Sequence, residues 1–139
     1  MDSVAGHWAV PGRSMTEQSS EEQTAPRWYT RPVLFVADIR RALRFYVDLL
    51  GFEKAWHEAD GVGKVCQVNR AECEIILCED ADRKDKARLF VELTGDGIAE
   101  LRREIVQRSI PSKKSWWGYD VIQIDDPDGN ELLFPLSDQ

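Results

Sequence analysis

The order of strand-like and helix-like segments repeats along this chain, and this repeat constrains the fold more than any other feature. In the first half, residues 31–36 are β-branched and aromatic, as expected of a strand. Asp38 suits the N-cap of a helix whose apolar residues recur at helical spacing over 39–50, and Gly51 suits its end. Three shorter strand-like stretches, with tight turns expected at 60–61 and 69–71, complete this half: 52–58, 64–69 and 72–78.

The second half repeats the same order after a charged linker over residues 80–86. A strand is expected over 87–93, and a helix over 98–108 that Pro111 stops. Strands are expected over 119–124 and 131–136, joined by a turn at 126–130 in which Gly129 takes positive φ; a further strand within 112–117 would complete the repeat. The chain is therefore predicted to have an α+β fold of two duplicated units that surround a concave cleft.

Length and composition favour one domain in an ordinary globular protein. Residues 1–28 are predicted to be a flexible polar tail, and 29–139 the folded domain, with module one at 31–79 and module two at 87–136. No apolar run reaches the length of a membrane helix and no signal pattern opens the chain, so no membrane partner and a cytoplasmic location are expected. The net charge of −7 argues against nucleic acid as a partner.

Cysteine and histidine provide few candidates for chemistry. The three cysteines form no C-x-x-C pair, so free thiols are expected rather than disulfides or a zinc site. Only two histidines are present: His7 lies in the tail, and His57 lies in an expected strand. His57 is either a general base or lone ligand, or simply a polar residue on an alternating strand.

Several short motifs resemble those of one known superfamily. Residues 35–38, 42–46 and 50–52 read F-V-A-D, A-L-R-F-Y and L-G-F, and residues 117–119 and 126–130 read W-G-Y and D-P-D-G-N. In this order and spacing they resemble the vicinal oxygen chelate superfamily, which includes glyoxalases, dioxygenases and bleomycin-resistance proteins. The central stretch 56–79 and the Trp-Gly pair look most like the bleomycin-resistance branch.

The resemblance implies two βαβββ modules that form a curved mixed sheet, a pocket in its concavity, and a homodimer. It also implies where metal-dependent relatives carry their ligands. Those positions fall at Arg31, near Ile76, at Arg88 and at Leu133 in this chain. Divalent cations are bound by imidazole and carboxylate groups, so no metal, no cofactor and no catalytic residue are predicted.

Residues that alternate with these positions on each strand should line the cavity. This places Val33, Phe35, Phe90, Glu92 and Glu131 there. An aromatic cavity with two carboxylates suits an aromatic, positively charged guest. Alternatively, the two carboxylates pair with Arg31 and Arg88 across the sheet, which makes the pocket less acidic.

The run from Trp116 to Tyr119 is the second aromatic feature. Adjacent tryptophans in an extended segment point to opposite sides, so one can face the cleft or a partner subunit, or both can be structural. The complete set of predicted ligand-binding residues is Phe35, Trp56, Phe90, Glu92, Trp116, Trp117, Tyr119 and Glu131.

The prediction for function is a metal-free protein that binds a small molecule and sequesters a cationic or aromatic antibiotic. The alternative is a metal-dependent lyase or ring-cleaving dioxygenase of the same superfamily, with a metal site built from His57, Glu58 or Glu74. A third possibility is a regulatory role in which the tail binds a partner.

Overall fold

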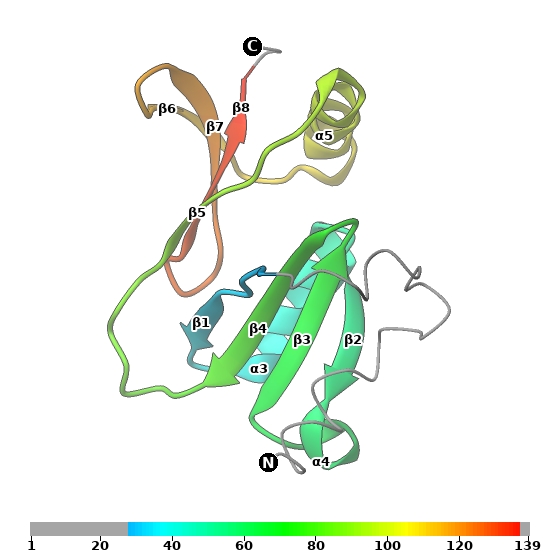
Figure 1. The fold of residues 1–139 in the computed structure, drawn as a ribbon, viewed down its shortest axis with the longest axis vertical. Coiled ribbons are helices and arrows are strands. Elements are labelled where there is room, and N and C mark those ends of the chain that lie inside the picture. Colours follow the sequence, from blue (N-terminus) through cyan, green and yellow to red (C-terminus); the bar gives the residue numbers. More distant parts are fainter. Residues whose placement is uncertain (1–27, 137–139) are drawn as a thin grey trace.

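The computed structural model describes residues 28–136, and the fold is mixed α+β, as predicted. Two four-stranded mixed sheets lie one above the other along the long axis of the molecule, in the orders β1-β4-β3-β2 and β5-β8-β7-β6 (Figure 1). In each sheet the first strand pairs parallel with the last, and the other neighbours are antiparallel. Of the expected N-terminal tail, only Trp28 belongs to the described residues, where it is exposed.

Module one contains the expected strand, helix and three strands, with one additional helical turn. Its elements are β1 (Val33–Val36), α3 (Ile39–Leu43), η2 (Arg44–Leu49), β2 (Glu53–His57), α4 (Glu58–Gly61), β3 (Val65–Arg70) and β4 (Cys73–Glu79).

The helix of module one begins at its predicted cap. The Asp38 carboxylate accepts hydrogen bonds from the backbone N–H groups of Arg40 and Arg41, which have no partner inside the helix. The second half widens into the π-helix η2, in which the Leu50 N–H bonds to the Phe45 carbonyl at 3.0 Å. Gly51 has positive φ, as predicted.

The turn predicted at residues 60–61 has an unexpected form. The chain makes a left-handed turn in α4, where Ala59 and Asp60 have φ values of 53° and 54°. The side chain of Glu58 packs against Gly63, so a Cβ there would lie 2.0 Å from Glu58 Cγ. The segment expected to form a tight turn therefore forms one left-handed helical turn. The absence of a side chain at Gly63 leaves room for Glu58 beside it.

Module two repeats the order with one helix. Its elements are β5 (Arg88–Phe90), α5 (Gly95–Arg108), β6 (Lys113–Trp116), β7 (Asp120–Asp125) and β8 (Glu131–Pro135). The strand expected within 112–117 is confirmed as β6. The helix begins three residues before its predicted start and ends at Arg108, and the left-handed residue Ser109 caps it before Pro111.

One hydrophobic core joins the two modules. Tyr46, Leu34 and Ile75 from module one belong to the same buried cluster as Leu132 and Ile124 from module two.

None of the helices within residues 28–136 is long and apolar enough to span a membrane.

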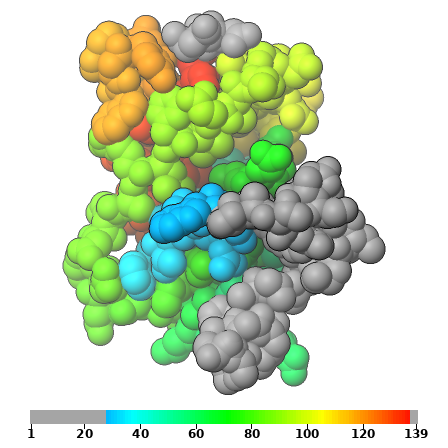
Figure 2. Space-filling view, viewed as in Figure 1, coloured from blue at the N-terminus to red at the C-terminus, as the bar shows by residue number. Residues whose placement is uncertain are grey.

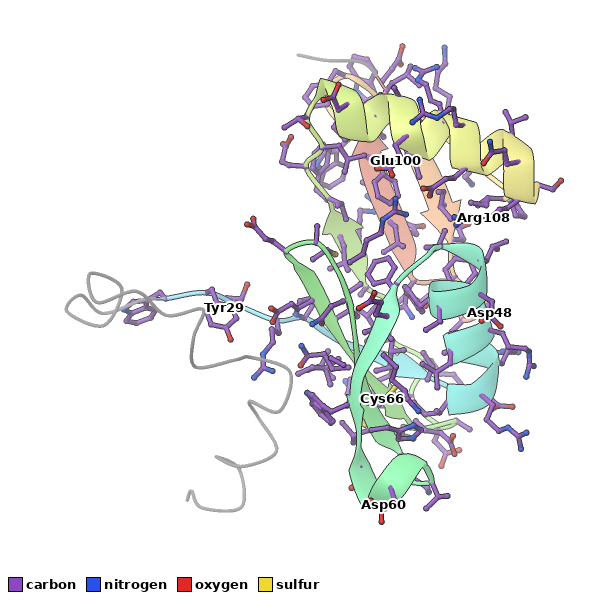
Figure 3. The ribbon with its side chains drawn as sticks, turned by 90° about the vertical axis from the view of Figure 1, so that its right-hand side faces the viewer. Tyr29, Asp48, Asp60, Cys66, Glu100 and Arg108 are labelled. Carbon is purple, nitrogen blue, oxygen red and sulfur yellow. The ribbon has the colours of Figure 1, made fainter. Side chains whose placement is uncertain are left out.

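The cysteines of the described chain are free thiols, as predicted. All three lie in strands of module one, and burial is the main reason that the pKa of each thiol is raised. Cys66 is fully buried, and the pKa of its thiol is raised to about 11 (Figure 3).

The turn 126–130 fastens module two to module one. Asp126 is 4% exposed, and its carboxylate accepts hydrogen bonds from the Asp128 and Asn130 N–H groups, from Asn130 Nδ2 and from Tyr46 Oη, at 2.8–2.9 Å. Asn130 Nδ2 also donates to the carbonyl of Phe35 at 3.3 Å. The D-P-D-G-N motif is thus a structural clamp between the modules.

A second clamp joins α5 to the end of β3 and to η2. Arg70 binds the Glu104 carboxylate with two nitrogens, at 2.8 and 2.9 Å, and also donates to the carbonyl of Leu50. Arg108 donates to the carbonyl of Leu49, and Figure 3 shows this residue where α5 approaches η2. The hydrogen bond from Arg70 holds the pKa of the Glu104 carboxyl below its usual value.

Candidate functional site

The candidate site is formed by the sheet faces that point away from the core. On module one, Val33 lies opposite Ile76, and Gln67 lies on the other side of Ile76. On module two, Phe90 lies opposite Leu133, and Gln123 lies on its other side. The two registers correspond residue by residue, so the sheets present equivalent faces.

Four of the predicted ligand-binding residues gather on module two: Phe90, Trp117, Tyr119 and Glu131. The rings of Phe90 and Tyr119 meet edge to face, with centroids 6.2 Å apart. The guanidinium of Arg88 lies over the Trp117 ring at 4.9 Å and binds Glu131 through Nε at 2.6 Å. Of the two alternatives for Glu131, pairing with Arg88 is therefore confirmed.

The two tryptophans lie on opposite sides of the chain. Trp116 ends β6 opposite Asp120, on the face that Ile122 directs to the core, yet it is 69% exposed at the sheet edge. Gly118 has a φ of +79°, which lets the Trp117 N–H bond to the Tyr119 carbonyl at 2.8 Å. This tight turn places Trp117 beside Arg88, apart from Trp116.

The equivalent group on module one is built around a glutamine that the sequence did not single out. Gln67 Oε1 accepts hydrogen bonds from Arg31 Nη1 at 2.7 Å and from Trp56 Nε1 at 3.1 Å. Its Nε2 donates to Asn69 at 2.9 Å. Gln67 is 5% exposed, and its only signal in the sequence is a polar residue between the apolar residues Cys66 and Val68.

A cleft of about 600 Å³ opens between the modules beside these groups. Its walls come from the segment that precedes β1, the β3–β4 hairpin and β5 with the segment that follows it. It includes Phe90 and Glu92 from the predicted set, and Arg31 and Arg88 from the metal-ligand positions. In the space-filling view, the start of the described chain lies at the boundary between the two modules (Figure 2).

Phe35 lies elsewhere. It borders a separate pocket of about 300 Å³ with residues of the linker, and the Arg83 guanidinium covers its ring at 4.0 Å. The structure thus does not bring Phe35 together with Phe90 and Trp117, because the linker between the modules covers its ring.

The four positions that the resemblance marks as metal-ligand positions do not fit a divalent cation here. Arg31 and Arg88 are cationic, Ile76 is apolar, and Leu133 is apolar and 2% exposed. Cations repel a metal ion and alkyl groups cannot coordinate one. Within residues 28–136, no group of three or more His, Cys, Asp or Glu side chains is placed to hold a metal.

His57 has a local structural role. Its Nε2 lies 2.9 Å from the carbonyl of Gly63, and its Nδ1 lies 3.3 Å from Lys54 Nζ. It therefore ties the end of β2 to the segment that precedes β3.

Comparison with known proteins agrees with this architecture. A sequence model of the family described as "Glyoxalase superfamily protein" matches residues 21–138. No match was found among curated protein sequences.

Three solved structures illustrate the range of similar proteins. A bleomycin-binding protein from Streptomyces verticillus, complexed with copper(II)-bleomycin, is 19% identical, with 83% of this chain and 98% of that chain covered and a TM-score of 0.61. A lactoylglutathione lyase from Agrobacterium tumefaciens is 17% identical, covering 79% and 94%, with a TM-score of 0.59. A fosfomycin resistance protein from Listeria monocytogenes is 13% identical, covering 81% and 93%, with a TM-score of 0.62. At these identities the likeness establishes the fold alone.

Proposed function

This chain belongs to the glyoxalase superfamily, and from that premise we propose that it binds and sequesters a small aromatic molecule, such as an antibiotic, without a metal. The observation that carries the proposal is the group formed by Phe90, Trp117 and Tyr119 beside the cleft between the modules. Aromatic faces of this kind bind planar or cationic ligands.

Sequestration also fits the chemistry of the cleft. It needs a complementary cavity and no catalytic group, and the positions where related enzymes hold a metal carry arginine and aliphatic side chains. Bleomycin-binding proteins share this fold, which makes bleomycin a suitable first probe. A lyase of the same fold is also known, so a metal-dependent reaction is the competing function that the experiment must separate.

The charge of the cleft permits a cationic ligand without requiring one. Glu72 and Glu92 line it, and neither forms an ion pair with another described residue. Glu131 is neutralised by Arg88, so it contributes less negative charge than an unpaired carboxylate would. We therefore place the ring of the ligand against Trp117 and any cationic group towards Glu92.

We further propose that a second copy of the chain covers the exposed part of these faces. Val33 is 46% exposed and Trp117 is 48% exposed, although both lie on strands or turns that face the cleft side of the sheets. Sedimentation of the purified protein should give a dimer, and a monomer at all concentrations would contradict this part of the proposal.

Thermal unfolding with and without ligand tests the function. A ligand that binds only the native state adds about 2.7 kcal/mol of stability at a hundredfold excess over Kd. Bleomycin, metal-free and copper-loaded, should raise the Tm, whereas nickel, zinc, manganese and iron alone should not. A shift with a metal alone would instead support the lyase or dioxygenase alternative.

Variants locate the binding site. Trp117→Ala should remove most of the Tm shift with bleomycin, and Trp116→Ala should show whether the second tryptophan contributes. Val106→Ala is the matched control, because Val106 is an exposed apolar side chain on α5. Equal shifts in all three variants would contradict a site at Trp117.

A further inference from the structure

Three arginines line the cleft between the modules, and two of them already have carboxylate partners. Arg70 binds Glu104 at 2.8 and 2.9 Å, and Arg88 binds Glu131 at 2.6 Å. Arg31 binds only the neutral amide oxygen of Gln67, at 2.7 Å, and forms no ion pair with a described residue. Its positive charge therefore has no carboxylate partner within the part of the chain that the structure describes.

The partner of Arg31 is held in place by its own hydrogen bonds. Gln67 is 5% exposed, and Trp56 donates to the same Oε1 atom while Asn69 accepts from Nε2. This network fixes one nitrogen of the half-buried guanidinium. The remaining donors of Arg31 form a planar fork, which matches the geometry of a carboxylate or a phosphate.

On module two, the arginine at the equivalent position has a carboxylate partner. Arg88 holds the place in β5 that Arg31 holds before β1, and Glu131 holds the place in β8 that Glu74 holds in β4. Glu131 binds Arg88 directly, whereas Glu74 lies 3.5 Å from Gln67 Nε2 instead. Gln67 thus stands between the arginine and the acid on module one, and the arginine is left with a neutral partner.

We propose that Arg31 is an anion-binding subsite of the cleft, so that the ligand carries a carboxylate or phosphate group in addition to its aromatic ring. This inference rests on the proposed function, since it assigns a second chemical group to the ligand of the same cleft. The anion docks where related enzymes place a metal ligand, and the ring lies on the side of Phe90 and Trp117.

Two probes with the same ring and opposite charge test the subsite: 2-naphthoate and 2-naphthylmethylamine. Calorimetric titration of the full chain should show that Arg31→Gln weakens 2-naphthoate at least tenfold and leaves the amine unchanged. Arg31→Lys, which keeps the charge but loses the fork, should give an intermediate loss. Arg40→Gln is the matched control, because Arg40 is an exposed arginine on α3, outside the cleft.

The outcomes separate the two proposals. Binding of bleomycin or of the amine, with no binding of 2-naphthoate, would overturn the anion subsite and leave sequestration standing. Binding of 2-naphthoate that depends on Arg31, with no antibiotic bound, would support the subsite and contradict sequestration of antibiotics. Equal affinity of 2-naphthoate for wild type and Arg31→Gln would overturn the subsite, and failure of every probe to bind would overturn both. Phosphate, titrated in competition, shows whether the anion alone is sufficient.

Discussion

The two modules have the same topology, and β1, β4 and β3 pair in the same register as β5, β8 and β7, but their last turns differ. In module one, β3 and β4 are joined by a two-residue turn in which Ala71 has a φ of 52°. In module two, the equivalent strands β7 and β8 are joined by residues 126–130, whose side chains reach into module one. The two modules therefore share one arrangement of strands and helices, and the turn at residues 126–130, which has no counterpart in module one, attaches them to each other.

The faces of the two sheets differ in the same way. Each carries an arginine, a glutamine and a glutamate at equivalent positions, yet only module two closes them into an ion pair with an aromatic ring above it. Equivalent residues thus acquire different electrostatic roles because their partners differ.

The clamp turn provides the strongest test of this difference. Asp126→Ala should lower the free energy of unfolding by about 3 kcal/mol, because it removes the acceptor for Tyr46 Oη and for the buried amides of Asn130. Urea denaturation measures the effect, with Asp48→Ala, on the exposed side of η2, as the control. A loss equal to that of the control would mean that the turn does not fasten the modules.

The clamp at α5 should show a smaller effect that depends on pH. Glu104→Gln should cost about 1–2 kcal/mol at neutral pH, because the charge-assisted hydrogen bonds to Arg70 weaken. The folded protein has the lower pKa at Glu104, so this stability is present above the unfolded value of about 4.3 and is lost as the pH falls further. The difference between wild type and variant should therefore shrink below pH 4 in denaturation series, and a constant difference would contradict the assignment.

A third variant gives the arginine of module two a neutral partner, as the arginine of module one has. Glu131→Gln releases Arg88 from its ion pair and should strengthen binding of 2-naphthoate. Its effect on stability should stay below about 1 kcal/mol, because both partners are partly exposed. Unchanged affinity for 2-naphthoate would show that the partner of the arginine does not decide which module accepts the anion.

The smallest effect concerns whether the modules open separately. Cys66 is buried with a pKa of about 11, so at pH 8 a disulfide reagent should label it only when module one opens. If the modules unfold as one unit, labelling of Cys66 follows the same urea midpoint as circular dichroism. Earlier labelling in the Asp126→Ala variant would show that the clamp turn couples them.

Much of the fold could be predicted from the sequence because it depends on local patterns. The Asp38 cap, the positive φ of Gly51 and Gly129, and the order of strands and helices are confirmed. The left-handed turn of α4 was wrongly predicted as a tight turn, because the packing of Glu58 against Gly63 is not visible in composition.

Less of the site could be predicted from the sequence, because its contacts join residues that are far apart along the chain. Arg88 and Glu131 are 43 positions apart, and Arg31 and Gln67 are 36 apart, so the register of the sheets decides whether they meet. Strand parity placed Phe90 and Glu131 on one face but gave no indication that the linker residue Arg83 covers Phe35. The role of Gln67 follows from three partners, which lie before β1, on β2 and on its own strand, and no local pattern encodes them.

The clamp at residues 126–130 also has a consequence during synthesis. The ribosome releases this turn well after its partners Phe35 and Tyr46, which emerge some 80–95 positions earlier. Module one can pair its own strands as soon as β4 is available, but its core face stays exposed to water until the strands of module two arrive. A chain truncated before Asp126 should therefore aggregate or engage chaperones even though all of module one is present.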